Sequence, residues 1–210
     1  MREVTWYFDF VSPYAYLGLH ALKRLPADTR LRYQPVLFAG LLKHWGQKGP
    51  AEIPPKRVWT YRSCIWWAQQ NRVPFRMPAA HPFNSLPFLR LSIAVGNSAE
   101  AVRAIFTALW TTGLDPANSV IIEDLAQTLG VHRERLTDPS VKNTLRECTE
   151  LAAHKGVFGV PTIGIDDQLF WGSDAVDFAA AYLADPGVLA TQEMRRADSL
   201  PIGASRQASN

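Results

Sequence analysis

Ser12 and Pro13 interrupt an apolar run near the start of the 210-residue sequence, at a position suited to binding an anion. Serine is a favoured helix N-cap and proline is favoured at the first helical position, so the pair predicts a helix start. The free N–H groups at a helix N-terminus carry partial positive charge and stabilise anions, thiolates included. Ser12 is therefore either a helix cap alone or a cap that also binds an anionic ligand.

The Val160–Pro161 step is a second candidate, because it follows a turn that holds Gly156 and Gly159 and precedes an expected strand. Most X–Pro bonds in folded proteins are trans. With a cis bond, the Val160 backbone would face the Ser12 edge, and its N–H and C=O could pair with a peptide-like ligand. The sequence alone leaves both isomers open.

Three more polar side chains stand at expected helix starts: Ser173, Asp174 and Lys56. Ser173 and Asp174 are either helix caps or a pair whose carboxylate receives an ammonium group. Lys56 follows two prolines and is either solvated or, where the middle of the chain folds back over Ser12, a ligand contact.

No metal or nucleotide site is expected from the sequence. The five histidines are scattered without metal-ligand spacing, and no phosphate-binding loop or nucleophile-elbow motif occurs. Cys64 and Cys148 are far apart and form no CxxC pair. The sequence therefore predicts no metal ligands.

Elements of two different periodicities must position these groups. Residues 4–10 alternate in polarity and predict a strand whose apolar face comprises Val4, Trp6, Phe8 and Phe10. A helix over about 13–25 and a strand over 31–35 are expected next. Strand, helix and strand in such a short span indicate a right-handed βαβ unit with parallel strands.

The middle of the chain shows helical periodicity. Four helices are expected, over Lys56–Asn71, Ala99–Thr112, Ile121–Leu129 and Ser140–Lys155. The buried face of the first is expected to comprise Val58, Tyr61, Ile65 and Ala68. The proline-rich segment Pro74–Pro87 is expected to be an irregular crossing.

The last third returns to strands. Residues 162–165 and 168–171 flank a two-residue turn and predict a β-hairpin, followed by a helix over 172–184 and a tail lying irregularly on the surface. This order predicts an α/β protein with the thioredoxin fold and a large all-helical insertion. The expected units are a discontinuous thioredoxin-like domain over 1–49 and 138–190, a helical insertion domain over 50–137, and a C-terminal tail over 191–210.

Composition excludes several classes of protein. With 47% hydrophobic and 20% charged residues, the chain is neither disordered nor of low complexity. A net charge of +3 is too mild to favour nucleic acid as a partner. No leader peptide, membrane span or disulfide framework is apparent, so a cytoplasmic protein with no membrane partner is expected. The seven tryptophans, several in the expected insertion, favour a homodimer.

Three motifs together resemble one known group of enzymes. They are Phe8-Asp9-Phe10-Val11-Ser12-Pro13-Tyr14-Ala15-Tyr16-Leu17-Gly18, Gly156-Val157-Phe158-Gly159-Val160-Pro161-Thr162 and Leu169-Phe170-Trp171-Gly172-Ser173-Asp174. In order and spacing the chain is similar to the 2-hydroxychromene-2-carboxylate isomerases and the kappa-class glutathione transferases. Those families share a thioredoxin fold with an all-helical insertion, related to that of the periplasmic disulfide oxidases.

The resemblance implies a role for each candidate residue. Ser12 would be the catalytic serine that hydrogen-bonds the sulfur of glutathione and holds it as thiolate. Val160, before a cis Pro161, would pair with the cysteinyl backbone of glutathione, while Ser173 and Asp174 would hold its γ-glutamyl end. Lys56 and Gln47 would contact the remaining part of glutathione, although the family often has Asn where this chain has Gln47.

The implied function is a glutathione-dependent cis–trans isomerisation of an aromatic carboxylate of the 2-hydroxychromene-2-carboxylate type, in aromatic compound degradation. A kappa-like glutathione transferase or peroxidase is the first alternative. A thiol–disulfide oxidoreductase-like protein is the second, disfavoured because Ser12 stands where a nucleophilic cysteine would be needed. A binding module without catalytic activity is the third.

Overall fold

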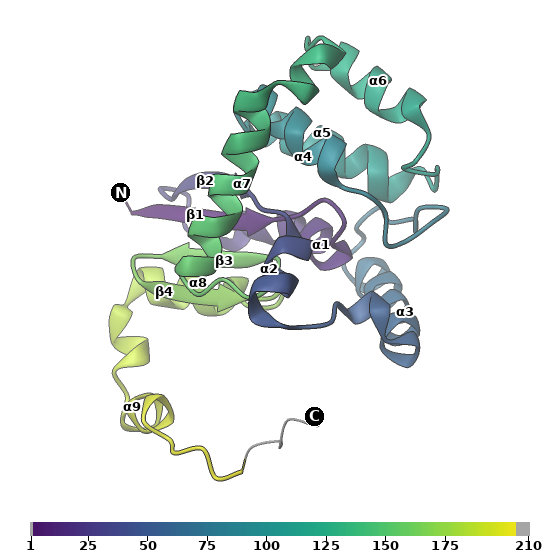
Figure 1. Ribbon diagram of the computed structural model, residues 1–210. Helices are drawn as coiled ribbons and strands as arrows, with labels where there is room; N and C mark the ends of the chain where they lie inside the picture. Colours follow the sequence, from purple (N-terminus) through teal and green to yellow (C-terminus); the bar gives the residue numbers. More distant parts are fainter. Residues whose placement is uncertain (1, 205–210) are drawn as a thin grey trace.

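The computed structural model describes residues 2–204 and contains one four-stranded sheet with helices on both faces (Figure 1). The strand order is β2-β1-β3-β4, comprising β1 (Glu3–Phe8), β2 (Arg30–Pro35), β3 (Thr162–Ile165) and β4 (Gln168–Trp171). β1 runs parallel to β2 and antiparallel to β3, and β3 pairs with β4 as a hairpin. The predicted βαβ unit and the predicted hairpin are both confirmed.

The alternation in β1 divides the core between the two faces of the sheet. Val4, Trp6 and Phe8 belong to the larger core, together with α1 (Pro13–Ala21), α5 (Ala99–Thr111) and α8 (Val176–Ala184). Tyr7 points to the opposite face and packs in a smaller core against α2 (Phe38–Trp45) and α7 (Pro139–His154). Figure 1 shows α2 and α7 crossing one face of the sheet.

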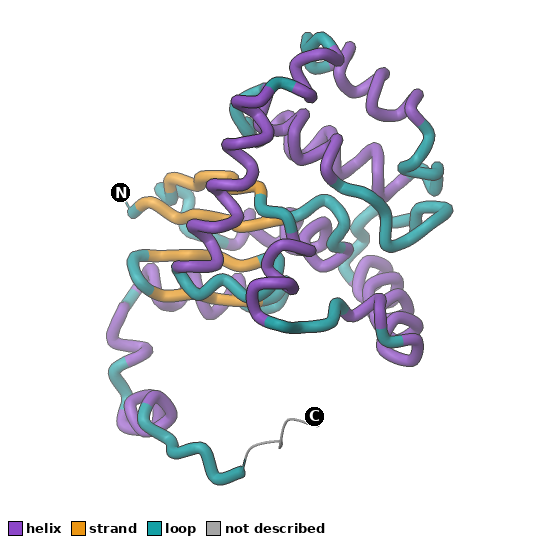
Figure 2. The backbone as a smooth tube through the Cα atoms, viewed as in Figure 1, coloured by secondary structure: helices purple, strands orange, loops and turns teal. Residues whose placement is uncertain are grey.

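Helices make up the regular structure between β2 and β3 in the described chain, as Figure 2 shows. The remaining helices are α3 (Pro54–Gln70), α4 (Leu86–Ala94), α6 (Ser119–Thr128) and α9 (Gln192–Asp198), with 3-10 turns at Leu22–Arg24, Pro50–Glu52, Arg133–Thr137 and Pro186–Leu189. The all-helical insertion is thus confirmed, while its boundaries at 50 and 137 stay a prediction. Within residues 2–204, no helix is both long and apolar enough to cross a membrane.

The expected buried face of α3 is wrong in part. Ala68 is buried as expected and Tyr61 is half-buried, but Val58 and Ile65 are exposed, and the helix buries Thr60 and Cys64 in addition. The physical reason is that α3 packs on α1 and the neighbouring 3-10 turn at the edge of the molecule, so small side chains suit the contact (Figure 1). Trp67 packs against the larger core, whereas Val58, Trp59, Ile65 and Trp66 are exposed.

Three helices lie where the sequence predicted none. α2 and α4 are short, and α4 begins at the end of the proline-rich segment, with Pro87 in its first turn. α9 forms inside the tail that was expected to be irregular, because Thr191 caps it through Met194 N–H and its charges suit the helix dipole. Residues 205–210 of the predicted tail lie outside the described residues.

Candidate active site

Ser12 caps α1 and also reaches across to the segment before β3. Its Oγ accepts a hydrogen bond from Ala15 N–H at 3.1 Å and donates to the Val160 carbonyl at 3.3 Å. The side chain is buried, and Pro13 occupies the first turn of the helix. The cap interpretation is confirmed, and the same hydroxyl faces the backbone of Val160.

The Val160–Pro161 bond is cis, and the chain around it is joined to the turn before α8. Gly172 N–H donates to the Pro161 carbonyl at 2.9 Å. Gly18 in α1 permits a close approach here, because a Cβ on it would lie 3.1 Å from Pro161 Cγ and 3.7 Å from Ser173 Cα. Ser12, Val160, Pro161 and Ser173 are thereby brought to one edge of the sheet.

Ser173 and Asp174 do not cap α8. That helix begins at Val176, and its N-cap residue is Ala175, which makes no side-chain cap bond. In the described part of the chain, neither the Ser173 hydroxyl nor the Asp174 carboxylate makes a side-chain hydrogen bond or ion pair. Both groups are free to bind a ligand.

Gln47 and Lys56 are exposed and lie at helix ends. Gln47 follows the left-handed Gly46 that ends α2, and Lys56 is in the first turn of α3. Among the contacts of residues 2–204, no hydrogen bond joins either side chain to Ser12. The structure therefore brings Val160, Pro161 and Ser173 together with Ser12, with the exposed Asp174 next to Ser173 in the chain, and within the described chain it shows no hydrogen bond from Gln47 or Lys56 to Ser12.

Asp9, which the sequence interpretation did not single out, is a buried carboxylate close to Ser12 in the chain. It accepts hydrogen bonds from Val11 N–H at 3.0 Å and Phe38 N–H at 2.8 Å. Burial raises the pKa of Asp9, and hydrogen bonds from Phe38, Val11 and Ser85 oppose that rise. The available signal was a charged residue within the apolar run that leads into Ser12.

Neither cysteine lies at this edge. Cys64 is in α3 and Cys148 is in α7, and both are free thiols. Burial raises the pKa of Cys64 to about 12, and burial likewise raises the pKa of Cys148. Both groups are therefore neutral thiols rather than nucleophilic thiolates at neutral pH. No cluster of three metal-ligating side chains occurs within residues 2–204.

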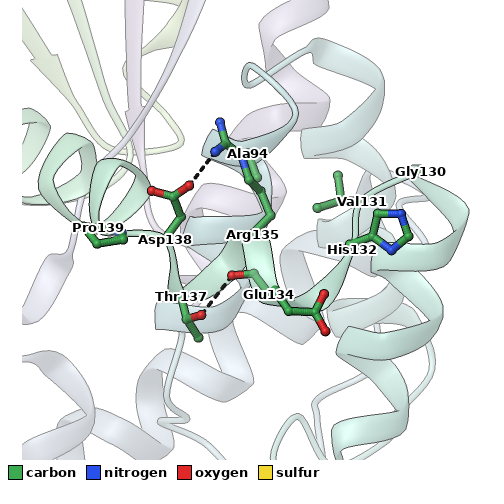
Figure 3. Close-up of a pocket in the computed structure, with 9 residues that line it drawn as sticks. All are labelled: Ala94, Gly130, Val131, His132, Glu134, Arg135, Thr137, Asp138 and Pro139. Carbon is green, nitrogen blue, oxygen red and sulfur yellow. Dashed lines mark hydrogen bonds and ion pairs between the residues drawn. The ribbon is translucent and has the colours of Figure 1, made fainter.

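A hollow of about 690 Å³ lies elsewhere, between α4 and the segment that joins α6 to α7 (Figure 3). Its polar lining includes His132, Glu134 and an ion pair between Arg135 and Asp138. None of the predicted site residues lines it. The candidate active site is therefore the edge around Ser12 and not this hollow.

Comparison with known protein families identifies the family to which the fold belongs. The model of the DsbA-like thioredoxin domain matches residues 3–184, which include the sheet, the Ser12 edge and the helical insertion. The chain belongs to the DsbA-like thioredoxin family. Members of such a family share the fold, so the reaction must be inferred from the residues of the site.

The relatives of this DsbA-like protein carry enzyme names. It is 30% identical over 193 residues to 2-hydroxychromene-2-carboxylate isomerase of Sphingobium xenophagum, covering 88% of this chain and 99% of the relative. It is 27% identical to glutathione S-transferase kappa 2 of Caenorhabditis elegans, over 88% of this chain and 93% of that one. A solved 2-hydroxychromene-2-carboxylate isomerase structure matches with a TM-score of 0.74 and 25% identity, covering 90% and 100% of the two chains.

Proposed function

We propose that this protein is a glutathione-dependent cis–trans isomerase acting on aromatic carboxylates of the 2-hydroxychromene-2-carboxylate type, in aromatic compound degradation. One observation carries the proposal: a hydroxyl, and not a thiol, stands at the N-terminus of α1 and faces the residue before a cis proline. A hydroxyl there can stabilise a thiolate supplied by another molecule but cannot itself form a disulfide. The isomerase relatives named above support the same choice.

The groups at this edge fit a γ-glutamyl tripeptide. The Val160 N–H donates to no group in residues 2–204, so it is available to a peptide carbonyl. The free Asp174 carboxylate and Ser173 hydroxyl can receive an α-ammonium group. Lys56 and Gln47, exposed at the outer side, offer a charge and an amide for a terminal carboxylate.

The chain's own residues position and stabilise charge. Glutathione, when bound, supplies a thiolate that adds to a carbon of the conjugated carbonyl system, permits rotation about the former double bond, and is then eliminated unchanged. Ser12 would turn its hydroxyl from the Val160 carbonyl toward the sulfur, while Ala15 N–H continues to donate to Oγ. The N-terminal dipole of α1 adds to this stabilisation, so the residues act by electrostatics and positioning.

The cytoplasm is the compartment we propose, because a reducing compartment keeps both glutathione and the two free cysteines in the thiol form. The partners are then two small molecules, glutathione and the aromatic carboxylate. Nucleic acid and membranes are not among the proposed partners.

The direct test follows the ultraviolet spectrum of 2-hydroxychromene-2-carboxylate after mixing with the protein. We expect isomerisation that requires glutathione and is absent when glutathione disulfide replaces it. Isothermal titration of glutathione into the protein should show saturable binding. Absence of both binding and spectral change would reject the proposal in favour of a non-catalytic module.

A kappa-like glutathione transferase or peroxidase is the second candidate, favoured by the 27% identity to the kappa relative. Its chemistry needs the same thiolate but consumes glutathione. Conjugation of a model aryl halide, or loss of thiol with a hydroperoxide, at a rate above that of isomerisation would select it. Recovery of all glutathione as free thiol after isomerisation selects the first candidate.

We also propose a homodimer formed through α3. Four large apolar side chains of that helix, Val58, Trp59, Ile65 and Trp66, are 38–69% exposed. A second copy of the chain would remove this surface from water. Sedimentation at micromolar concentration should give twice the chain mass, and a Trp59→Glu, Trp66→Glu variant should give the monomer mass. A wild-type monomer contradicts the dimer and leaves the isomerase proposal standing.

A further inference from the structure

His81 lies outside every motif that defines the site and contacts the segment that carries Ser12. Its Nε2 is 2.7 Å from the Val11 carbonyl, and its Nδ1 is 2.7 Å from the hydroxyl of Tyr61 in α3. The Tyr61 hydroxyl oxygen also lies 2.9 Å from the His81 carbonyl oxygen. His81 is half-buried, and the centroid of its ring lies 5.6 Å from that of Trp110.

These contacts define the tautomer of His81. A carbonyl oxygen only accepts, so Nε2 carries the hydrogen and donates to Val11. In a neutral imidazole Nδ1 is then an acceptor, and it shares the single hydrogen of the Tyr61 hydroxyl with the His81 carbonyl. Burial lowers the pKa of His81 and so favours this neutral form, although the bond to Val11 works in the other direction. The Val11 carbonyl thereby fixes which nitrogen carries the hydrogen.

Two consecutive peptide groups before Ser12 are each held at both ends. In the Val11–Ser12 peptide, His81 holds the oxygen and the Asp9 carbonyl accepts from Ser12 N–H at 3.0 Å. In the Phe10–Val11 peptide, Trp110 Nε1 donates to the oxygen at 2.9 Å and the Asp9 carboxylate accepts the N–H at 3.0 Å. Because a peptide group is planar, holding both ends fixes the plane and thus the direction of the next Cα.

The two sides of this arrangement come from different parts of the chain. Asp9, directly after β1, accepts both N–H groups, whereas His81 and Trp110 from the helical middle of the chain donate to both oxygens. The helical insertion therefore contacts the backbone of the loop that carries Ser12. Replacing either side chain by an apolar residue would leave a backbone carbonyl unpaired.

We propose that His81, whose Nε2–H donates to the Val11 carbonyl and whose Nδ1 contacts Tyr61, is a positioning residue that sets the orientation of the Ser12 hydroxyl toward the bound thiol. The proposal rests on the proposed function, because the thiol is that of glutathione. His81 does not touch the reacting atoms. It acts through the Val11–Ser12 peptide.

The test compares two replacements of His81 in the full-length protein. His81→Gln keeps an N–H at the place of Nε2, whereas His81→Leu keeps bulk and removes the donor. The readout is the pKa of bound glutathione, taken from its ultraviolet thiolate absorbance against pH, together with kcat and KM. His20→Leu is the matched control, because His20 is also half-buried with a lowered pKa but lies at the far end of α1.

We expect His81→Leu to raise the pKa of the bound thiol and to lower kcat about tenfold at neutral pH, with the KM for glutathione little changed. His81→Gln should restore most of both values, and Tyr61→Phe should give a smaller loss in the same direction. His20→Leu should change neither value, even where it lowers the melting temperature.

Other outcomes overturn the inference in separable ways. If His81→Leu lowers the melting temperature while the thiol pKa and kcat stay at wild-type values, His81 is a structural contact only. If His81→Leu does not fold, the other two variants decide. His81→Gln keeps the donor and Tyr61→Phe keeps the ring volume. A loss of kcat in His81→Gln as large as that in Tyr61→Phe would reject the role. A wild-type protein that forms no glutathione thiolate rejects the proposed function and this inference together.

Discussion

The two halves of the candidate site differ in how the fold holds them. The half nearest α1 contains Ser12 and Val160, which are 7% exposed each and joined by a hydrogen bond. The outer half contains Gln47, Lys56 and Asp174, which are exposed and whose side chains make no hydrogen bond among residues 2–204. The inner half is buried and hydrogen-bonded before any ligand binds, whereas the exposed side chains of the outer half must be ordered by the ligand.

This difference divides the expected contributions to catalysis. A prearranged donor costs no reorganisation when charge develops, so the inner half should act on turnover. Long exposed side chains lose conformational entropy when they bind and are screened by water, so the outer half should act weakly and mainly on affinity. If this division is right, substitutions in the inner half should change kcat and substitutions in the outer half should change KM.

Ser12→Ala should have the largest effect. A hydrogen bond to a charged group contributes roughly 1.5–3 kcal/mol, and one pKa unit corresponds to about 1.4 kcal/mol. The pKa of bound glutathione should therefore rise by about one to two units, and kcat at neutral pH should fall about ten- to a hundredfold. The pH–rate profile measures both, and part of the rate should return at higher pH.

The same substitution also removes a helix cap, which costs about 1 kcal/mol of stability. Ser12→Thr keeps both the hydroxyl and the cap and is the control for this effect. A lower melting temperature with an unchanged pH profile and unchanged kcat would mean that Ser12 is only a cap and that the inner half does not stabilise the thiolate.

Lys56→Gln should have a smaller effect of a different kind. We expect the KM for glutathione to rise by at most about fivefold with little change in kcat, because an exposed charge pair contributes roughly 1 kcal/mol or less. The effect should shrink at high salt. Lys48→Gln, a nearby exposed lysine with no predicted contact, is the control. A loss in kcat that exceeds the change in KM would contradict the division into two halves.

The same division describes what could be predicted from sequence. Ser12 and Val160 stand at the ends of regular elements, and local periodicity and capping rules place such ends. The groups that fix the loop could not be placed in this way, because Trp110 lies 100 residues from its partner Phe10 and His81 lies 70 from Val11. Those contacts depend on how the insertion folds back over the sheet.

The error on α3 has a related cause. Its apolar residues Val58 and Ile65 have helical spacing, so the pattern correctly predicted a helix, but the neighbours of a helix decide which of its faces is buried. Here the packing partner is α1, whose Tyr14 hydroxyl meets Ser63 Oγ at 3.2 Å. A short polar contact of this kind leaves no signal in the hydrophobic pattern.

The contact of His81 with the loop before Ser12 should also make stability depend on pH. Burial lowers the pKa of His81 below 6.5 in the folded protein, so the unfolded chain binds the proton first as the pH falls. Stability should therefore be complete above pH 6.5 and should decline as the pH falls through and below that value. In His81→Gln the decline in melting temperature between pH 7 and 5 should be smaller than in wild type. An equal decline in both proteins would place the titration elsewhere, for example at His20, whose pKa is also lowered.

The smallest effect is expected from removing both thiols. Replacing Cys64 is the stricter test of a role for thiols, because Cys64 lies in α3 beside Ser63 and Tyr14, the pair that joins this helix to the first turn of α1. Its pKa of about 12 leaves almost no thiolate at neutral pH, and Cys148 is remote from Ser12 on α7. The Cys64→Ala, Cys148→Ala protein should therefore keep isomerase turnover within a few-fold of wild type, with some loss of melting temperature from the cavity at Cys64.

Cys64→Ser, which keeps more of the volume, separates the packing loss from chemistry. A hundredfold fall in turnover without unfolding in both Cys64 variants would show that a protein thiol takes part in the reaction, and the assignment of the inner half to Ser12 would then be wrong.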